Sequence, residues 1–549
     1  MITSCRRRLT PAVLLAFAAP VMCLVASCSA EGTAPDPTAA AETSSAADVK
    51  ERAMPAEPKP ADAAPAASAE TVAAGAAGKV HACAGAGRWF PDDADRLGGL
   101  VDAYLSVQPP DLGAAPAALI VPHAGYQFSG SVAGKAYAAL KGRSYGRVVL
   151  IGFSHQMPVR RGSVLRVDAY ETPLGSIPVD VEAVDALLKC PVVTEQPAPH
   201  KTEWSCENQL PFLQRALKEF RMVELFVGDL TDEERTTLAD AVRPLADSGT
   251  LLVVSSDFTH YGPNYGYVPF RDNIQKNLQA LNSMAIHRIV QIDLPGWKQH
   301  LTQTRDTICG RNPIGLLLKI VEPWKDVQAA AVAADSSGRQ TGDWTNSVTY
   351  TSIAFWRAGE GLTSAEKQTL LRLARDTVTA FLKTGEKPTA DPARYDLTPA
   401  LKARGAAFVT LKNAGQLRGC IGHIVAVGPL HESIIENACH ACKDHRFVSN
   451  PITEAEGPAL TVEISVLSPT RRVHDLETIV TGRDGLIMAR GRSRGVFLPQ
   501  VPVEQGWDRT QYLTHLCGKA GLPNDAWKDP ETELYRFTAQ VFHEEKPKK

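Results

Sequence analysis

The chain lacks an excess of either charge. Its 549 residues carry 58 Lys and Arg against 60 Asp and Glu, and no block of basic residues interrupts that balance. Proteins that bind nucleic acids need clustered positive charge to contact the phosphates. The composition therefore excludes nucleic acid as the expected partner.

Cysteine is also scarce for a chain of this size, with 11 residues. Cys5 and Cys23 fall within an N-terminal signal, and Cys28 directly follows it. The remaining eight are too few for a disulfide scaffold but enough for one or two bridges in an exported protein. Their pairing cannot be deduced from the sequence.

Large apolar side chains are nearly absent between the signal and the body of the chain. Residues 29–78 are rich in Ala, Pro, Ser and Thr. Such a segment cannot bury enough apolar surface to offset the entropy lost on ordering. We predict a flexible tether over residues 28–80.

Residues 1–27 begin with basic side chains and continue with an apolar core over 9–24. This core is too short and too rich in alanine for a comfortable transmembrane span, which predicts a secretory signal peptide; the alternative is an uncleaved anchor. The Val-Ala-Ser-Cys ending resembles the bacterial lipobox, which implies lipidation of Cys28 and attachment to a membrane surface. Ser29 after this cysteine implies a cell-envelope lipoprotein, sorted to the outer membrane in a Gram-negative cell.

The roughly 465 residues that follow are too many for one ordinary core. The residue pattern changes near 357–364. We predict two domains, over residues 83–358 and 363–545.

Three apolar runs in the first domain each lead to a histidine: His123, His155 and His260. A helical pattern over 131–140 separates the first two runs, which predicts a strand, a crossover helix and a parallel strand in one sheet. Open α/β sheets place their sites at the carboxyl ends of such strands. We therefore expect the three histidines to meet on one edge. The runs are 117–121, 148–151 and 251–254.

Cys309 precedes a predicted helix in which Asn312 is the N-cap and Pro313 the first helical residue. A helix amino terminus favours thiolate over thiol, and a thiolate is both a nucleophile and a soft metal ligand. The other interpretation is a buried, inert cysteine.

Four ordered motifs carry a resemblance across nearly the whole first domain: VPHAGY (121–126), GFSH (152–155), SSDFTH (255–260) and TICGRNPIG (307–315). Together they resemble the Memo-like family, called AmmeMemoRadiSam system protein B in bacteria. The resemblance implies an α/β fold with a mostly parallel sheet sandwiched by helices, similar to the class III extradiol dioxygenases. It also implies a metal at His123, His155 and Cys309, with His260 as acid/base and Asp257 beside it.

The ligand set departs from the usual iron site of two histidines and a carboxylate, because Cys309 is the third ligand. Its softness favours copper, or an Fe(II) site of altered electronics. The family usually has histidine where this chain has Trp204, and often at Gln209, whereas Glu203 and Glu207 are retained. This departure implies a changed pocket wall and a changed substrate.

The sequence favours metal-dependent oxidative chemistry, with Fe or Cu, on a small molecule such as an aromatic compound. Two alternatives remain open. One is a cysteine-dependent hydrolase in which Cys309 attacks and His260 or His155 acts as the base. The other is a non-catalytic envelope module that binds a metal or a partner.

In the second domain, LRGCIG (417–422) and FLPQVPVEQGWD (497–508) resemble the AMMECR-type domain, called AmmeMemoRadiSam system protein A. This resemblance implies an α+β fold on an antiparallel sheet. Cys420 between glycines predicts a turn where the backbone closely approaches a neighbour, and Arg418 is a candidate anion ligand there. The alternative is a strand crossing shaped by glycine around a buried cysteine.

Cys439 and Cys442 form a CxxC pair on one face of a predicted helix. The pair is interpreted as a redox pair, as a second metal site, as a local disulfide or as two free thiols. A second metal site would draw on the nearby histidines His423, His431 and His445.

The fusion of the two families implies that the domains contact each other or act on one substrate. Both families are usually encoded beside a radical-SAM enzyme. Its cytosolic cofactors and oxygen-sensitive cluster conflict with an exported chain, so we do not expect a direct radical-SAM partner.

Overall fold

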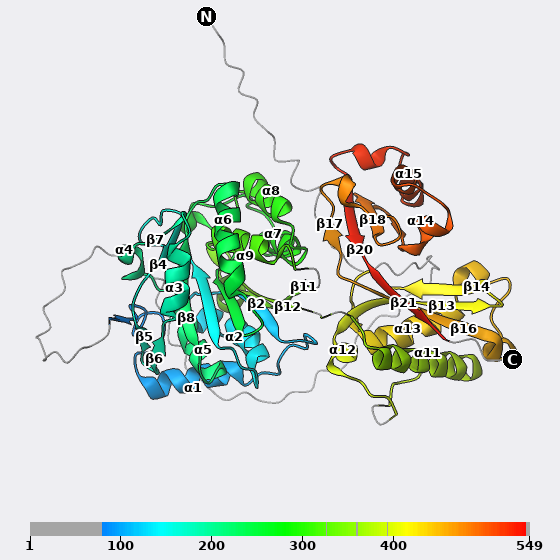
Figure 1. The fold of residues 1–549 in the computed structure, drawn as a ribbon, viewed down its shortest axis with the longest axis horizontal. Helices are drawn as coiled ribbons and strands as arrows, with labels where there is room; N and C mark the ends of the chain where they lie inside the picture. Colours follow the sequence, from blue (N-terminus) through cyan, green and yellow to red (C-terminus); the bar gives the residue numbers. More distant parts are fainter. Residues whose placement is uncertain (1–78, 325–326, 358, 360, 392–393, 545–549) are drawn as a thin grey trace, which may run out of the picture. The chain divides into compact units, whose positions relative to one another are not determined.

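The computed structural model describes residues 79–324, 327–357, 359, 361–391 and 394–544 (Figure 1). The predicted signal peptide, Cys28 and the predicted tether up to residue 78 lie outside the described residues. Within the described ranges, every helix is too short or too polar to cross a bilayer.

The first domain is built on a mixed nine-stranded sheet in the order β10-β12-β2-β9-β3-β8-β4-β7, with β11 paired to β12. The four central strands β2, β9, β3 and β8 run parallel. They are apolar runs buried on both faces, as expected for parallel strands covered by helices. The strand bounds are β2 Pro116–Val121, β3 Arg147–Gly152, β4 Gly162–Val164, β7 Val193–Glu195, β8 Arg221–Val227, β9 Thr250–Ser255, β10 His260–Tyr261, β11 Val327–Ser336 and β12 Ser347–Arg357.

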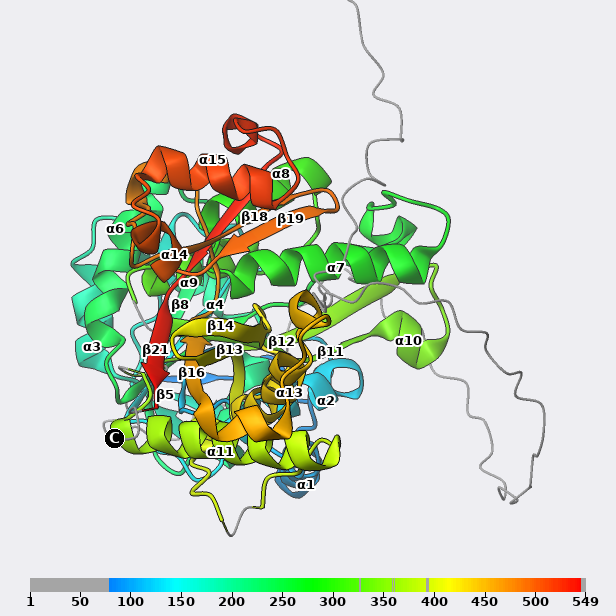
Figure 2. The ribbon, with the colours of Figure 1, turned by 90° about the vertical axis from the view of Figure 1, so that its right-hand side faces the viewer.

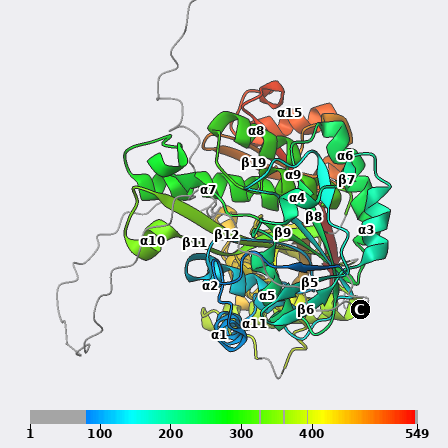
Figure 3. The same cartoon turned by 90° about the vertical axis from the view of Figure 1, so that its left-hand side faces the viewer.

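Helices cover both faces of this sheet (Figures 1 and 3). On one face α1, α2 and α5 pack against one another, and on the other lie α6, α7, α8 and α9 with α3 beside α6. A small sheet of β1, β5 and β6 completes the domain. The helix bounds are α1 Ala94–Leu105, α2 Tyr126–Tyr137, α3 Val181–Leu188, α5 Leu210–Ala216, α6 Asp232–Val242, α7 Ile274–Val290, α8 Leu294–Thr304 and α9 Arg311–Val321. The small strands are β1 Val80–Ala82, β5 Ala169–Thr172 and β6 Gly175–Pro178.

The three predicted parallel strands are confirmed as β2, β3 and β9. β9 lies between β2 and β3, an order that the sequence did not address. The predicted crossover helix is present with other bounds than 131–140, because α2 begins at Tyr126 and gives way to a 3-10 turn, Ala138–Leu140. Gly130 and Gly134 let α2 pack closely on Tyr104, because a Cβ at either position would meet that residue.

The second domain has antiparallel sheets and fewer helices (Figure 2). One sheet has the order β14-β13-β16-β21 with β15 paired to β13, and α11 and α13 cover it. The other has the order β17-β20-β18-β19 and packs on α15. The bounds are α11 Ser364–Thr384, α13 Leu430–Cys442, α15 Arg509–Lys519, β13 Arg404–Asn413, β14 Gln416–Gly422, β15 Gly428–Pro429, β16 Leu460–Leu467, β17 Arg471–Arg472, β18 Gly485–Arg490, β19 Ser493–Phe497, β20 Glu533–Phe537 and β21 Ala539–His543.

All eight cysteines of the described ranges are free. The one or two disulfide bridges that the sequence allowed are therefore not formed in this structure.

Candidate metal centre

Two imidazoles and one thiol converge at the carboxyl edge of the first sheet. His123 follows β2, His155 follows β3, and Cys309 precedes α9. One ligand atom from each of the three lies within 4.8 Å of the other two. The rings of His123 and His155 meet edge to face, with centroids 5.2 Å apart. The structure thus brings together the three residues that the motifs suggested as metal ligands.

His123 presents a buried nitrogen that no group of the described protein satisfies. Its side chain is 2% exposed, Nδ1 lies 3.0 Å from Ser255 Oγ, and Nε2 has no hydrogen-bond partner within the described residues. A buried polar atom without a partner costs about 1–3 kcal/mol. A metal ion bound at Nε2 would remove that cost, so the donor set fits a cation.

His155 is held by a buried carboxylate. Its Nδ1 lies 2.9 Å from Glu203 Oε1, and its backbone N donates to Oε2. Burial alone would raise the pKa of Glu203, but hydrogen bonds from His155 and from the amide of Ser205 hold that pKa below its ordinary value. The ionised carboxylate accepts from Nδ1–H and leaves Nε2 as the ligand atom, an arrangement common for metal-bound histidines.

The expectation that the helix terminus stabilises a Cys309 thiolate is wrong for the metal-free protein. Burial, together with the carboxylates of Asp257 and Glu203, raises the pKa of this thiol well above its usual value. The predicted cap is also wrong, because Gly310 is the N-cap of α9 and Asn312 donates to Asp229 instead. A bound cation would supply the positive charge that the helix end does not.

His260 also reaches the site and lies beside the thiol. Cys309 Sγ lies 3.7 Å from His260 Nε2 and 3.8 Å from Nδ1. Nδ1 donates to the Phe258 carbonyl at 3.0 Å. Burial lowers the pKa of His260, only partly offset by Asp257. A neutral imidazole within reach of a thiol is also the resting arrangement of a general base and its nucleophile, so this contact does not decide against a cysteine hydrolase.

Asp257 supports the loop that carries His123. Its Oδ1 accepts from the backbone N of His123 at 2.8 Å and of Ala124 at 3.3 Å. Burial raises the pKa of Asp257. This carboxyl therefore positions the ligand loop, a role that its place next to the suggested acid/base histidine did not indicate.

An aromatic wall flanks the exposed ligand. Trp204 stacks on His155 at 5.1 Å between centroids and 3° between planes, and Trp89 stacks on Trp204 at 4.6 Å and 15°. The Arg88 guanidinium lies 5.6 Å from the Trp204 ring centre and 5.7 Å from that of Trp89. Where the resemblance implies a histidine, this chain has a ring that covers a face of His155.

The comparisons with known proteins assign both halves of the chain. A family model described as Memo-like protein matches residues 81–354, and a model described as AMMECR1 matches residues 371–542. The chain belongs to the Memo-like and AMMECR1 families. This confirms the resemblance drawn from the motifs.

Several archaeal relatives are also similar to part of the chain. Protein MK0488 of Methanopyrus kandleri is 42% identical over 199 residues, covering 34% of this chain and 93% of the relative. Protein PH0010 of Pyrococcus horikoshii is 42% identical over 190 residues, covering 33% and 90%.

Two solved structures are similar to a part of the chain, and both have a low TM-score. The crystal structure of uncharacterized protein PH0010 is 41% identical, with a TM-score of 0.29, and covers 32% of this chain and 91% of that one. The crystal structure of uncharacterized protein JW3007 from Escherichia coli K12 is 17% identical, with a TM-score of 0.25, and covers 38% and 86%.

In the AMMECR1 domain, the Arg418 side chain binds other residues of the same domain. Its guanidinium binds Glu456 at 2.6 and 2.9 Å and the Asn450 carbonyl at 3.1 Å. The bond to Arg418 lowers the pKa of Glu456 to about 2. The anion that Arg418 binds in this structure is therefore the Glu456 carboxylate of the same domain.

Cys420 lies within strand β14, so the predicted turn is wrong. The predicted close approach is present, because a Cβ on Gly419 would lie 2.0 Å from the Ala441 carbonyl of α13. The half-buried Cys420 thiol accepts from Thr410 at 3.2 Å. These contacts match the alternative of a glycine-shaped strand crossing.

Cys439 and Cys442 are both on α13, as predicted, and both are buried in the domain core. Over the described residues, no group with metal-ligand spacing forms around them. The structure shows two free, buried thiols, one of the outcomes that the sequence left open.

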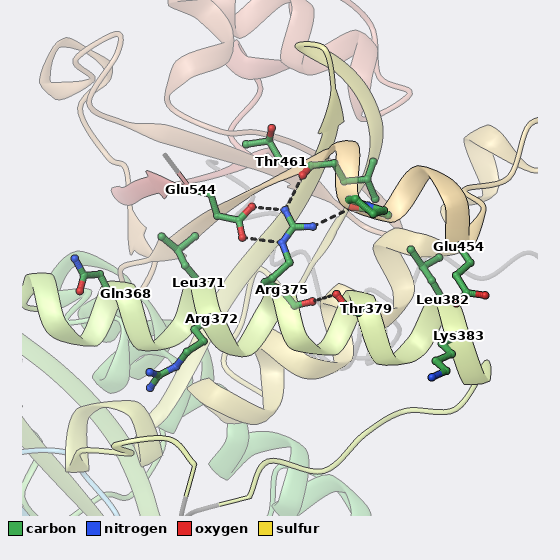
Figure 4. A pocket seen from close by; sticks show the side chains of 13 residues that line it. Gln368, Leu371, Arg372, Arg375, Thr379, Leu382, Lys383, Glu454, Thr461 and Glu544 are labelled. Carbon is green, nitrogen blue, oxygen red and sulfur yellow. Dashed lines mark hydrogen bonds and ion pairs between the residues drawn. The ribbon is translucent and has the colours of Figure 1, made fainter. Parts of the chain in front are cut away.

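A groove of about 710 Å³ lies between α11 and the start of β16 (Figure 4). Its central Arg375 binds Glu544 and the carbonyls of Gly457 and Leu460. Among the thirteen described residues that line the groove, none is histidine or cysteine. These lining residues therefore offer no imidazole or thiol as a metal ligand.

Proposed function

We propose that this protein is a lipid-anchored metalloprotein of the cell envelope that binds Fe or Cu through His123, His155 and Cys309. We further propose that it performs oxidative chemistry on a small molecule, such as an aromatic compound. The observation that carries the proposal is the convergence of three ligand atoms within 4.8 Å, one of them the unsatisfied Nε2 of His123.

The donor set supports one of two metals. Two imidazoles with an oxygen ligand suit Fe(II), whereas a thiolate in third place favours copper or an iron site with altered electronics. When bound, such a metal would supply redox chemistry and open coordination positions. A fold similar to that of the class III extradiol dioxygenases, implied by the motifs, agrees with a reaction that uses oxygen.

The surrounding side chains support a role in substrate handling. His260 has a lowered pKa and lies beside Cys309, so a neutral imidazole is placed to accept a proton from a substrate hydroxyl. Trp204 and Phe153 offer flat apolar surfaces next to His155. We infer that these rings contact an apolar, ring-shaped part of the substrate.

A second candidate is a metal-binding module without turnover. Trp204 stacked on His155 favours it, because the wall narrows access to the exposed ligand. Oxygen consumption with a panel of catechols separates the two, since only the enzyme consumes oxygen.

The direct test is metal content after anaerobic purification. We expect about one Fe or Cu per wild-type chain and little in His123→Ala, with His445→Ala as a matched control because that side chain is 69% exposed. Equal metal in His123→Ala and wild type would overturn the proposal. Lipid anchoring is tested separately by Cys28→Ala, which should move the protein from the detergent phase to the aqueous phase.

A further inference from the structure

The hydrogen bonds behind His123 determine which of its ring nitrogens carries the proton. We propose that Ser255 is a positioning residue that locks His123 as the Nδ1–H tautomer, so that Nε2 presents a lone pair to the site before any metal arrives. The use of this lone pair rests on the proposed function, whereas the tautomer itself does not.

The argument begins with the orientation of Gln209. The Tyr137 hydroxyl lies 2.8 Å from Gln209 Oε1 and donates to it. Gln209 Nε2 donates to the Pro122 carbonyl at 3.0 Å, which only an NH₂ group can do. The amide is therefore fixed, and Nε2 must also be the donor in its 2.9 Å contact with Ser255 Oγ.

The single hydrogen of Ser255 is also assigned. Its hydroxyl donates to the Ser205 carbonyl, which can only accept. Oγ accepts from Gln209, which leaves one lone pair for the contact with His123 Nδ1 at 3.0 Å. Nδ1 must therefore be the donor, and Nε2 carries no hydrogen.

The alternative tautomer would break this network at a site without water access. Tyr137, Gln209 and Ser255 are fully buried, and His123 is 2% exposed. If His123 carried its proton on Nε2, the Ser255 hydrogen would have to turn to Nδ1 and abandon the Ser205 carbonyl. The unsatisfied carbonyl would disfavour that state.

The same loop also fixes the orientation of the second imidazole, that of His155. The backbone N of Ser205 donates to Glu203 Oε1 at 2.9 Å, and that oxygen accepts from His155 Nδ1. Ser205 thus joins the two supports through its amide and its carbonyl. Residues 203–209 therefore hold the proton on Nδ1 of both His123 and His155, which leaves Nε2 of each ring with a lone pair for the site.

The tautomer is measured on the metal-free full chain by NMR with ¹⁵N-labelled histidine, the His123 signal being assigned by its loss in His123→Gln. We expect Nδ1 to be protonated and Nε2 bare. A bare Nδ1 in the wild type would overturn the proposal without any variant.

Ser255→Ala removes the acceptor, so the His123 signal should shift toward a mixture and Cu(I) affinity should fall about 10- to 100-fold. Ser255→Thr keeps a hydroxyl and should restore both. Ser163→Ala is the matched control, because Ser163 is a fully buried serine 2.9 Å from His200 Nε2 in the same domain.

The two failures are distinguishable. A wild type that takes up neither Cu(I) nor Fe(II) defeats the proposed function and leaves the tautomer measurement standing. Unchanged tautomer and Cu(I) affinity in Ser255→Ala would defeat the positioning role.

Discussion

Cys309 must lose a proton before its sulfur can bind a metal strongly. Burial and nearby carboxylates raise the pKa of this thiol, so the metal-free protein holds it protonated at neutral pH. Each binding event then releases one thiol proton, and raising the pH favours binding. We expect affinity to rise about tenfold per pH unit across the neutral range.

This dependence is checked by competition with a chelator of known affinity at several pH values. Cys309→Ser should bind far more weakly and show a flatter slope. Affinity of the wild type that does not change with pH would contradict the assignment of the sulfur as a ligand.

Glu203 is not itself a predicted ligand, but we expect its replacement to weaken metal binding. In Glu203→Gln, an amide replaces the carboxylate that accepts from the backbone N and the ring Nδ1 of His155. Metal affinity should fall about 10- to 100-fold, as for other residues that support a histidine ligand. Glu207→Gln is the control, because Glu207 is equally buried and binds His81 instead. Equal losses in both variants would show a general effect on the fold.

At this scale the sequence predicted which residues would come together, but not their hydrogen bonds. His123, His155 and Cys309 sit in short motifs whose family resemblance implied one shared site, and the structure brings them within 4.8 Å of one another. No role was predicted for Ser255, although a serine at the end of an apolar strand was a signal for one. Its effect depends on partners 46 and 132 residues away, Gln209 and His123, which no local pattern reveals.

At the scale of elements, Gly419 allows strand β14 to lie against helix α13. In Gly419→Ala the new Cβ would meet the Ala441 carbonyl, a backbone atom that cannot swing away. We expect a loss of about 1–3 kcal/mol in the unfolding free energy of the AMMECR1 domain, measured by denaturant titration.

Gly518→Ala serves as the control for this variant, because an added Cβ there meets nothing within 4 Å. Gly518 lies in α15, so its replacement should be neutral or stabilising by about 1 kcal/mol. A neutral Gly419→Ala would contradict the close approach of strand and helix.

The sequence predicted which segments form strands better than it predicted the order of those strands in the sheet. Apolar runs identified β2, β3 and β9. The insertion of β9 between β2 and β3 could not be predicted, because strand order follows from packing between distant segments. The turn expected at Cys420 failed for a related reason. Gly419 serves a contact with α13, which lies further along the chain, and Gly422 serves a contact with Ala407 and Phe408 of β13.

At the scale of the whole molecule, the Memo-like and AMMECR1 domains have separate hydrophobic cores. The first core is formed by residues between Phe90 and Trp356, and the cores of the second domain by residues from Leu370 onward. We therefore expect residues 79–358, which include β1, to fold alone and to bind the metal with the affinity of the full chain.

Calorimetry and metal titration of this fragment check the expectation. A folded fragment that has lost the metal would mean that the second domain completes the site. That result would support the proposed contact between the two domains and contradict a centre made by the first domain alone.

The most direct measurement of the central claim is X-ray absorption at the metal edge of the loaded full-length protein. We predict a first coordination shell with two imidazole nitrogens and one sulfur, and loss of the sulfur component in Cys309→Ser. A shell made only of oxygen and nitrogen in the wild type would contradict the account.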